Sequence, residues 1–214
     1  MDHTEEEQLE RLREWWSRNG KFVIAGVVVG LAAVIGTRMW TEARNSKAEA
    51  ASQQYERLLG ALGKRDSGQA EQLADGLLEA YGSTPYATLA RLALARLKVE
   101  QGDLGAAAAL LRQVVDGDGE AEIRQIARLR LARVLLADGK GDAALALLKD
   151  ADSSVTRADS ESVKGDIYLA LGKRAEARAA YERAKALGGG NPRLLQMKLD
   201  DLAVADGEGE GALP

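Results

Sequence analysis

The chain has 214 residues, of which 46% are hydrophobic and 29% are charged, a balance typical of a folded protein. It contains no cysteine and a single histidine, His3, which excludes disulfides, cysteine nucleophiles and a three-ligand zinc site. The net charge of -4 provides no basic surface for a phosphate backbone, so no nucleic acid is expected as a partner. Alanine is abundant and proline is scarce, with only three residues, and both features favour helices. We therefore expect an all-α protein.

The first apolar segment is predicted to cross a membrane. Residues 22–40 contain one charge, Arg38, and span about 28 Å as a helix, close to the roughly 30 Å of a hydrocarbon core. Arg38 reaches the headgroups by extending its side chain. The expected interface anchors are Trp15, Trp16, Arg38 and Trp40. We therefore assign residues 1–21 to an N-terminal segment and residues 22–40 to a transmembrane helix, with a buried core helix as the alternative.

Three further features of this segment concern its processing, its orientation and its packing. The acidic residues before the span disfavour a cleaved signal peptide, and the small-residue triplet at 48–50 lies too far beyond the apolar run. Positively charged residues are balanced on the two sides, so charge counting leaves the orientation open. Gly26 and Gly30 form a G-x-x-x-G pattern, which predicts a packing face for another helix, although glycine is also common in membrane helices.

Three segments beyond the span align without internal gaps, at residues 94–111, 131–148 and 164–181. Each contains a glycine, an alanine five residues later and a larger apolar residue four residues further on. These positions are Gly102, Ala107 and Leu111, then Gly139, Ala144 and Leu148, then Gly172, Ala177 and Tyr181. Glycine ends one helix in a left-handed conformation, and alanine lets the next helix pack closely. The pattern predicts a tetratricopeptide-like α-solenoid of helix pairs over residues 41–205.

The ends of the repeat region have their own signals. Residues 46–62 and 69–81 are predicted to form a degenerate first pair of helices. Thr84 is predicted as an N-cap, because a proline follows it at the first helical position. Residues 192–204 are predicted to form a C-terminal capping helix, and residues 206–214, rich in glycine and acidic residues, a disordered acidic tail.

No catalytic, metal-binding or cofactor-binding pattern is found in the sequence. Residues 116–127 resemble a calcium loop, but Ala121 occupies the required glycine position and Ala127 the position of the last glutamate. Residues 188–190 are glycines without the strand and the lysine of a phosphate-binding loop, so they indicate the end of a helix. We therefore expect a protein that is not an enzyme and needs no cofactor.

The remaining function class is recognition of other polypeptides. The first helices of successive pairs line the concave wall of a solenoid, so equivalent positions there predict a groove. These positions are Arg96, Arg133 and Asp166 in one set and Leu92, Leu129 and Ser162 in another. The two arginines are candidates for binding a carboxylate or an acidic segment, the alternative being a solubilising role.

The residues REWWSRNGK at 13–21, the glycine-rich span ending in Arg38 and Trp40, and the alanine-rich repeats together resemble the YfgM family of ancillary SecYEG translocon subunits. The resemblance extends from residue 1 to about residue 204. It implies a single-pass bacterial inner-membrane protein with a cytoplasmic N-terminus and a periplasmic repeat domain. It also implies two partners, the SecYEG translocon and a PpiD-type periplasmic chaperone.

The expected function is therefore a membrane-anchored adaptor of protein export. It would associate with the translocon and a periplasmic chaperone, and assist the folding or hand-over of emerging secretory polypeptide clients. The alternative is an envelope regulatory scaffold that sequesters a signalling or cell-division protein. The short amphipathic helix formed by Leu9, Leu12 and Trp16 offers a contact for such a regulator.

Overall fold

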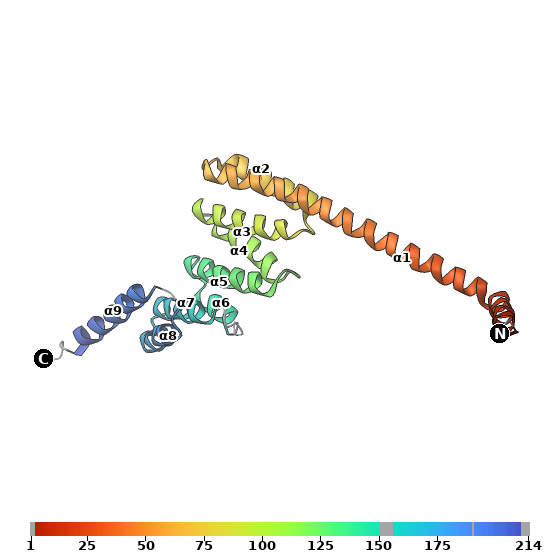
Figure 1. The fold of residues 1–214 in the computed structure, drawn as a ribbon. Coiled ribbons are helices and arrows are strands. Elements are labelled where there is room, and N and C mark those ends of the chain that lie inside the picture. The colour runs from red at the N-terminus through yellow and green to blue at the C-terminus, as the bar shows by residue number, and fades with distance from the viewer. Residues whose placement is uncertain (1–2, 150–155, 190, 211–214) are drawn as a thin grey trace. The chain divides into compact units, whose positions relative to one another are not determined.

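A computed structural model describes residues 3–149, 156–189 and 191–210. These residues form α-helices joined by short turns, with no strand in the described part of the chain, which confirms the predicted all-α class (Figure 1). The chain divides into two compact units, Met1–Ala50 and Ala51–Pro214. The boundary falls within helix α1, His3–Gly63, so the last turns of α1 belong to the second unit.

The first unit contains the apolar stretch of α1. In the described part of the chain, this helix alone is long and apolar enough to cross a membrane, with a mean hydropathy of 2.1 over its most apolar window. None of that window is buried within the protein. Phe22 and Met39, near the two ends of the stretch, are 72% and 68% exposed. A core helix of a soluble protein would be covered, so the exposure fits a membrane span.

The second unit is a succession of helix pairs. The last turns of α1 pair with α2 (Ser67–Tyr81), α3 (Pro85–Glu100) with α4 (Leu104–Val115), α5 (Ala121–Ala137) with α6 (Gly141–Leu147), and α7 (Arg157–Ala170) with α8 (Arg174–Ala186), followed by α9 (Pro192–Glu210). From α2 onward each helix packs against the next, and α5 also packs against α7 (Figure 1). This arrangement confirms the predicted tetratricopeptide-like solenoid.

Residues with a left-handed backbone conformation form the turns between the two helices of each pair. The glycines of the repeat pattern have positive φ angles, 82° at Gly102, 73° at Gly139 and 73° at Gly172. At the first of these turns, Gly102 donates its N–H to the Val99 carbonyl at 3.0 Å, which satisfies a carbonyl at the end of α3. The same bonding recurs at the other two turns, as predicted from the spacing.

The turn between α1 and α2 has the same geometry without a glycine. Arg65 has a φ angle of 58°, and its N–H donates to the Leu62 carbonyl at 3.0 Å. The next residue, Asp66, donates to the Ala61 carbonyl at 3.0 Å and accepts a hydrogen bond from the Gln69 N–H. The first pair is therefore built like the others, although the glycine spacing did not reveal its turn.

Small residues bring the helices of each pair together. The repeated alanines, Ala107, Ala144 and Ala177, are each 0% exposed. The larger residues four positions later, Leu111, Leu148 and Tyr181, are between 0% and 2% exposed. Because alanine adds only a methyl group to the helix surface, the second helix of a pair can lie close to the first.

Two helix starts show how the sequence signals are used. The Asn191 side chain accepts from the N–H groups of Arg193 and Leu194 at 3.0 and 3.3 Å, as an N-cap does. Thr84 precedes Pro85 as predicted, but its hydroxyl donates to the Tyr81 carbonyl at 2.8 Å and makes no capping bond to α3. The proline and the extended backbone of Thr84 therefore define this start without a side-chain cap.

The capping helix is longer than the sequence indicated. Leu195 and Leu202, on α9, are each 2% exposed and pack with α8 as a lid. Helix α9 continues to Glu210, whereas we expected its end near residue 204. Of the tail predicted at 206–214, residues 206–210 thus belong to α9, and residues 211–214 lie outside the described part of the chain.

Candidate functional site

Helices α3 and α5 border a hollow of about 340 Å³ in the second unit. Its lining residues are Leu92, Ala95, Arg96 and Val99 of α3, Leu111 of α4, and Arg130, Arg133 and Val134 of α5. Five of these side chains are apolar and three are arginines, and no acidic residue lines the hollow. The site therefore combines an apolar floor with positive charge that the lining itself does not neutralise.

The three arginines differ in their intramolecular contacts. Arg130 and Arg133 are exposed and make no hydrogen bond or ion pair with the described residues. Arg96 pairs with Glu100 one turn later, Nε to Oε1 at 2.8 Å, with the arginine side chain 82% exposed. Exposed pairs of this type contribute only about 0.2–1 kcal/mol, so a ligand carboxylate can replace Glu100 at low cost. All three guanidinium groups are thus available to carboxylates.

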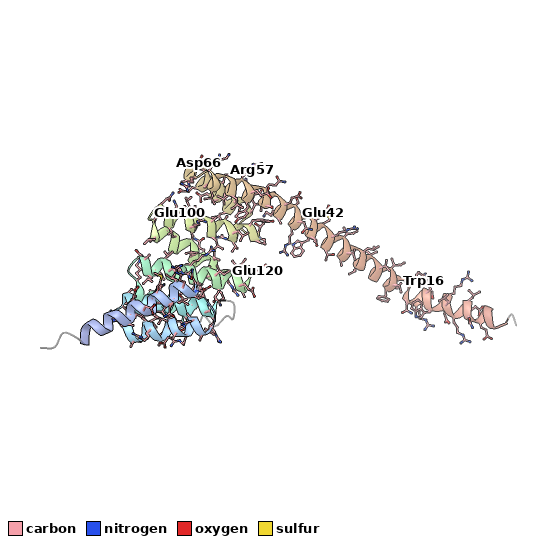
Figure 2. The ribbon with its side chains drawn as sticks, turned by 60° about the vertical axis from the view of Figure 1, so that its left-hand side comes forward. Trp16, Glu42, Arg57, Asp66, Glu100 and Glu120 are labelled. Atoms are coloured by element: carbon pink, nitrogen blue, oxygen red, sulfur yellow. The ribbon has the colours of Figure 1, made fainter. Side chains whose placement is uncertain are left out.

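A larger hollow of about 540 Å³ adjoins the first one and shares Leu92, Arg96 and Arg130 with it. Its further lining residues include Tyr55, Leu59 and Leu62 of α1, Leu89 and Ala93 of α3, and Glu100. Glu100 lies at the end of α3 (Figure 2). Leu59 is 47% exposed there. We call the two hollows together the α3–α5 groove. Its apolar surface extends from the last turns of α1 to α5.

The structure brings together part of the predicted groove. Leu92, Arg96 and Arg133 line the hollow between α3 and α5. Leu129 does not, because it is 6% exposed and packs in the core cluster around α5. Sequence reasoning missed Arg130, which lies one helical turn before Arg133 and therefore on the same side of α5.

Ser162 and Asp166 lie on α7, away from these two hollows. Asp166 is engaged within the protein: its Oδ1 accepts a hydrogen bond from the Tyr181 hydroxyl at 2.6 Å and also binds the Lys198 ammonium of α9. Burial, and then the hydrogen bond to Asp166, raise the pKa of the Tyr181 hydroxyl. The hydroxyl therefore stays protonated and joins α8 to α7, while Lys198 joins α9 to the same carboxylate.

A second charged site lies between α7 and α8. The Glu161 carboxylate accepts hydrogen bonds from Lys164 at 2.8 Å and from Arg183 at 2.6 Å, and its side chain is 12% exposed. Burial alone would raise the pKa of Glu161, but the hydrogen bonds from Lys164 and Arg183 outweigh it, so the pKa is lowered. These charges are paired with one another, which indicates a link between two helices of a pair.

The predicted membrane-facing residues are uncovered in the first unit. A Cβ atom added at Gly26 or at Gly30 would meet no atom within 4 Å, so this face is open to another helix. Trp40 is 63% exposed, and the Arg44 guanidinium lies over its ring at 4.7 Å. Such a pair suits the membrane interface, where the ring lies among headgroups and the cation reaches water. Arg38 lies two residues before Trp40 on the same helix.

In the described ranges, no group of three or more histidine or acidic side chains is placed to hold a metal ion. The comparisons with known proteins cover most of the chain. The sequence profile of the tetratricopeptide repeat-like domain family matches residues 13–204. In solved structures, TPR-like repeats of a kinesin light chain-type protein from Podospora anserina superpose with a TM-score of 0.59 at 22% identity, covering 75% of this chain and 88% of that chain. This likeness concerns the fold.

Curated relatives are similar to this chain over most of its length. A protein of Aggregatibacter actinomycetemcomitans named ancillary SecYEG translocon subunit is 31% identical over 199 residues, which is 92% of this chain and 97% of the relative. A Haemophilus influenzae protein of the same name is 28% identical with the same coverage. An Escherichia coli protein of the same name is 36% identical over 112 residues, which is 51% of this chain and 52% of the relative. The repeat fold and these relatives indicate an adaptor rather than an enzyme. The chain therefore belongs to the tetratricopeptide repeat-like family that includes the ancillary SecYEG translocon subunits.

Proposed function

We propose that this protein is a membrane-anchored adaptor of the protein-export machinery that associates with the SecYEG translocon. The observation that carries the proposal is the alignment with translocon subunits over 97% of their length, apolar helix and repeats included. We propose a single pass through the bacterial inner membrane, with the N-terminus in the cytoplasm and the repeats in the periplasm. In that orientation the groove faces the compartment that secretory chains enter.

The α3–α5 groove supplies the binding surface in this proposal. Carboxylates of an extended segment bind Arg96, Arg130 and Arg133, while its large apolar side chains lie on Leu92 and Val99. The partners are emerging secretory polypeptides and a PpiD-type periplasmic chaperone. Anchoring near the channel raises the effective concentration of such segments to the millimolar range, so weak and quickly reversible contacts suffice. Reversible contacts allow hand-over without an energy source.

Site-specific photocrosslinking in cells tests this function. A crosslinker at Val99, which is 41% exposed in the groove, should capture channel subunits and secretory chains during export. A crosslinker at Gln72, exposed on α2 outside the groove, is the matched control and should not. Capture of one defined signalling or cell-division protein at Val99, without export components, would instead establish the regulatory scaffold.

Charge reversal distinguishes a specific role of the groove arginines from a general effect of net charge. The double variant Arg130→Glu and Arg133→Glu should reduce crosslinking from Val99 several-fold, because like charges then face the acidic segments. The control is Arg112→Glu, an exposed arginine of α4 that does not line the groove. Equal loss in the control and the double variant would refute a specific role of the groove arginines.

A reporter enzyme fused after residue 214 tests the orientation. Alkaline phosphatase is active only in the periplasm, so the fusion should be active. An inactive fusion, together with activity of a reporter that requires the cytoplasm, would reverse the proposed orientation and remove the groove from the export side.

A further inference from the structure

The N-terminal part of α1 has a surface that the proposed adaptor function does not use. We propose that residues 7–18 lie along the membrane surface as an amphipathic helix and insert Leu9, Leu12 and Trp16 into the headgroup region. The bilayer is the same one that residues 22–40 cross. The occupant of this apolar face is thus the lipid interface itself.

The apolar face is well defined. Leu9, Leu12 and Trp16 follow one another at spacings of three and four residues, which places them on one side of a helix. They are 63%, 61% and 51% exposed, respectively. A continuous face of large apolar side chains at this exposure requires a cover, and the membrane that begins a few residues later is the nearest apolar phase.

The opposite side of the same helix carries charges that neutralise one another. Arg11 pairs with Glu7 at 3.3 Å, and Arg18 pairs with Glu14 at 2.9 Å, each four residues apart. At about 100° per residue these four side chains fall in one stripe, roughly 180° from the apolar face. The helix therefore presents a polar side to water and an apolar side to lipid, the distribution typical of an interfacial helix.

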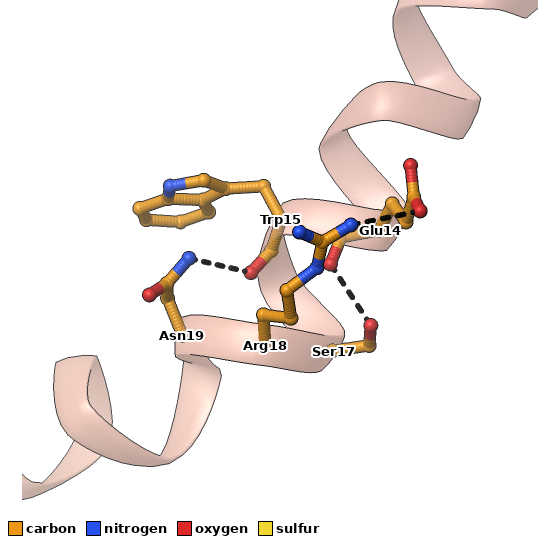
Figure 3. A network of polar contacts seen from close by, with 5 residues as sticks. All are labelled: Glu14, Trp15, Ser17, Arg18 and Asn19. Atoms are coloured by element: carbon orange, nitrogen blue, oxygen red, sulfur yellow. Dashed lines mark hydrogen bonds and ion pairs between the residues drawn. The ribbon is translucent and has the colours of Figure 1, made fainter.

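A bend separates this helix from the span. Ser17 donates its hydroxyl hydrogen to the Glu14 carbonyl at 2.9 Å, and Asn19 donates from its side-chain amide to the Trp15 carbonyl at 3.1 Å (Figure 3). Side-chain bonds to carbonyls of the preceding turn weaken the regular ladder and bend helices. The helix changes direction near Trp16 (Figure 2).

Gly20 lies beside the bend, one turn after Trp16. It is buried, although its neighbours along α1 are mostly exposed, because the Trp16 ring lies against it. A Cβ atom at this position would approach Trp16 Cε2 to 3.1 Å. Glycine thus lets the indole ring lie against the backbone where the helix turns.

Distance along the helix shows why a bend is needed. If α1 continued straight out of the membrane, Leu12 would stand ten residues before Phe22, about 15 Å beyond the hydrocarbon core at 1.5 Å per residue. The headgroup region is only about 5–8 Å thick on each side, so a straight helix would leave Leu9 and Leu12 in water. Turning the helix at residues 17–20 returns both side chains to the interface.

The absence of cysteine from the sequence permits a direct test on the full chain. Single-cysteine variants carry a nitroxide label in vesicles of phosphatidylethanolamine and phosphatidylglycerol, at Leu9→Cys and Leu12→Cys on the apolar face. The matched controls are Arg11→Cys and Glu14→Cys on the polar face. The measurement is the ratio of label collisions with lipid-soluble oxygen to collisions with a water-soluble nickel complex.

We expect this ratio to be several-fold higher on the apolar face than on the polar face. Equal, water-like ratios on both faces would mean that the helix projects into solution. Low collision rates with both reagents at Leu9 and Leu12 would mean that a protein or a second copy covers the face. Either result would overturn the proposal. Neither depends on translocon binding, so the test stands apart from the proposed adaptor function.

A second variant tests the bend itself. Combining Ser17→Ala with Asn19→Ala removes both side-chain bonds to the helix carbonyls. The contrast between Leu12→Cys and Glu14→Cys should then decrease, because a straighter helix leaves the interface. An unchanged contrast would show that these two bonds do not set the direction of the helix.

Discussion

At the scale of single residues, the contact between Gly165 and Tyr181 fixes how α7 meets α8. A Cβ atom at Gly165 would lie 2.4 Å from Tyr181 Cε1 and 2.5 Å from Cδ1. The ring has no room to move, because Tyr181 is 0% exposed and its hydroxyl is bound to Asp166. The two helices can therefore approach this closely only with glycine at position 165.

We predict that Gly165→Ala lowers the free energy of unfolding of the repeat unit by about 2–3 kcal/mol through overpacking. Denaturation followed by circular dichroism measures it. The control is Gly76→Ala in α2, where a Cβ atom meets nothing within 4 Å and alanine should add up to about 1 kcal/mol. A Gly165→Ala variant as stable as the original chain would show that α7 and α8 are not held at this distance.

Glu161 makes the stability of the same pair depend on pH. Its pKa is lowered in the folded state, because the hydrogen bonds from Lys164 and Arg183 outweigh the effect of burial. A lowered pKa means that the ionised carboxylate stabilises the fold above the unfolded pKa of about 4.5, and that this contribution is lost as the pH falls through the folded value.

We therefore predict that Glu161→Gln destabilises the repeat unit by about 1–2 kcal/mol at pH 7 and that the difference from the original chain shrinks below pH 4. Thermal midpoints between pH 3 and pH 7 measure both effects. Glu182→Gln, at an exposed position of α8, should stay within about 0.5 kcal/mol at every pH. A constant difference for Glu161→Gln across this range would contradict the ionic role.

Sequence periodicity locates such residues but does not say what they touch. Asp166 falls at the position equivalent to Arg96 and Arg133, which predicted a groove role, and that role stays a prediction. Its observed partners, Tyr181 and Lys198, come from α8 and α9. They lie 15 and 32 residues further along the chain. A pattern confined to one helix carries no information on those contacts.

At the scale of elements, the turns follow one geometry with different residues. Arg65 occupies the left-handed position that glycine occupies in the other pairs. A left-handed conformation costs a residue with a Cβ atom about 1–2 kcal/mol, whereas glycine loses about 0.5–1 kcal/mol of chain entropy on folding. The first turn is therefore less favourable than the turns at Gly102 and Gly139.

Arg65→Gly should raise the free energy of unfolding by about 0.5–1 kcal/mol, since it removes this strain and keeps the hydrogen bonds of the turn. Chemical denaturation of the repeat unit measures the gain. Lys64→Gly, one residue earlier and without a positive φ angle, should give a small loss. A loss of stability in both variants would mean that the arginine side chain contributes more to the turn than its conformation costs.

The helix pairs also show where sequence reasoning reached its limit. The glycine, alanine and large apolar positions predicted the pairs and their order, because each has one steric reason that acts locally. The tryptophan expected in a tetratricopeptide repeat is replaced by Arg91, Arg128 and Glu161. Arg91 reaches Gln113 of α4 at 3.2 Å, and Glu161 reaches Arg183 of α8. The missing aromatic was visible in the sequence, but the polar contacts that replace it were not.

At the scale of the whole molecule, α1 serves two units. Its apolar stretch fits a membrane span, whereas Ala51, Leu58 and Ala61 are 0%, 1% and 2% exposed in the repeat unit. Leu58 and Ala61 cover Ala70, Ala74 and Leu77 of α2. The sequence predicted both uses of the helix, since an apolar run and an amphipathic run follow each other without a break.

Two truncations separate these roles. Residues 46–214 should be recovered from the aqueous fraction without detergent, as a helical protein that unfolds cooperatively, because the span is removed and the core of the first pair is kept. The full chain should remain with the membrane until detergent is added. Residues 64–214 should be less stable than residues 46–214 by several kcal/mol, since removal of Leu58 and Ala61 exposes the buried side of α2. Equal stability of the two fragments would show that the solenoid begins at α2 and that the end of α1 only links it to the membrane.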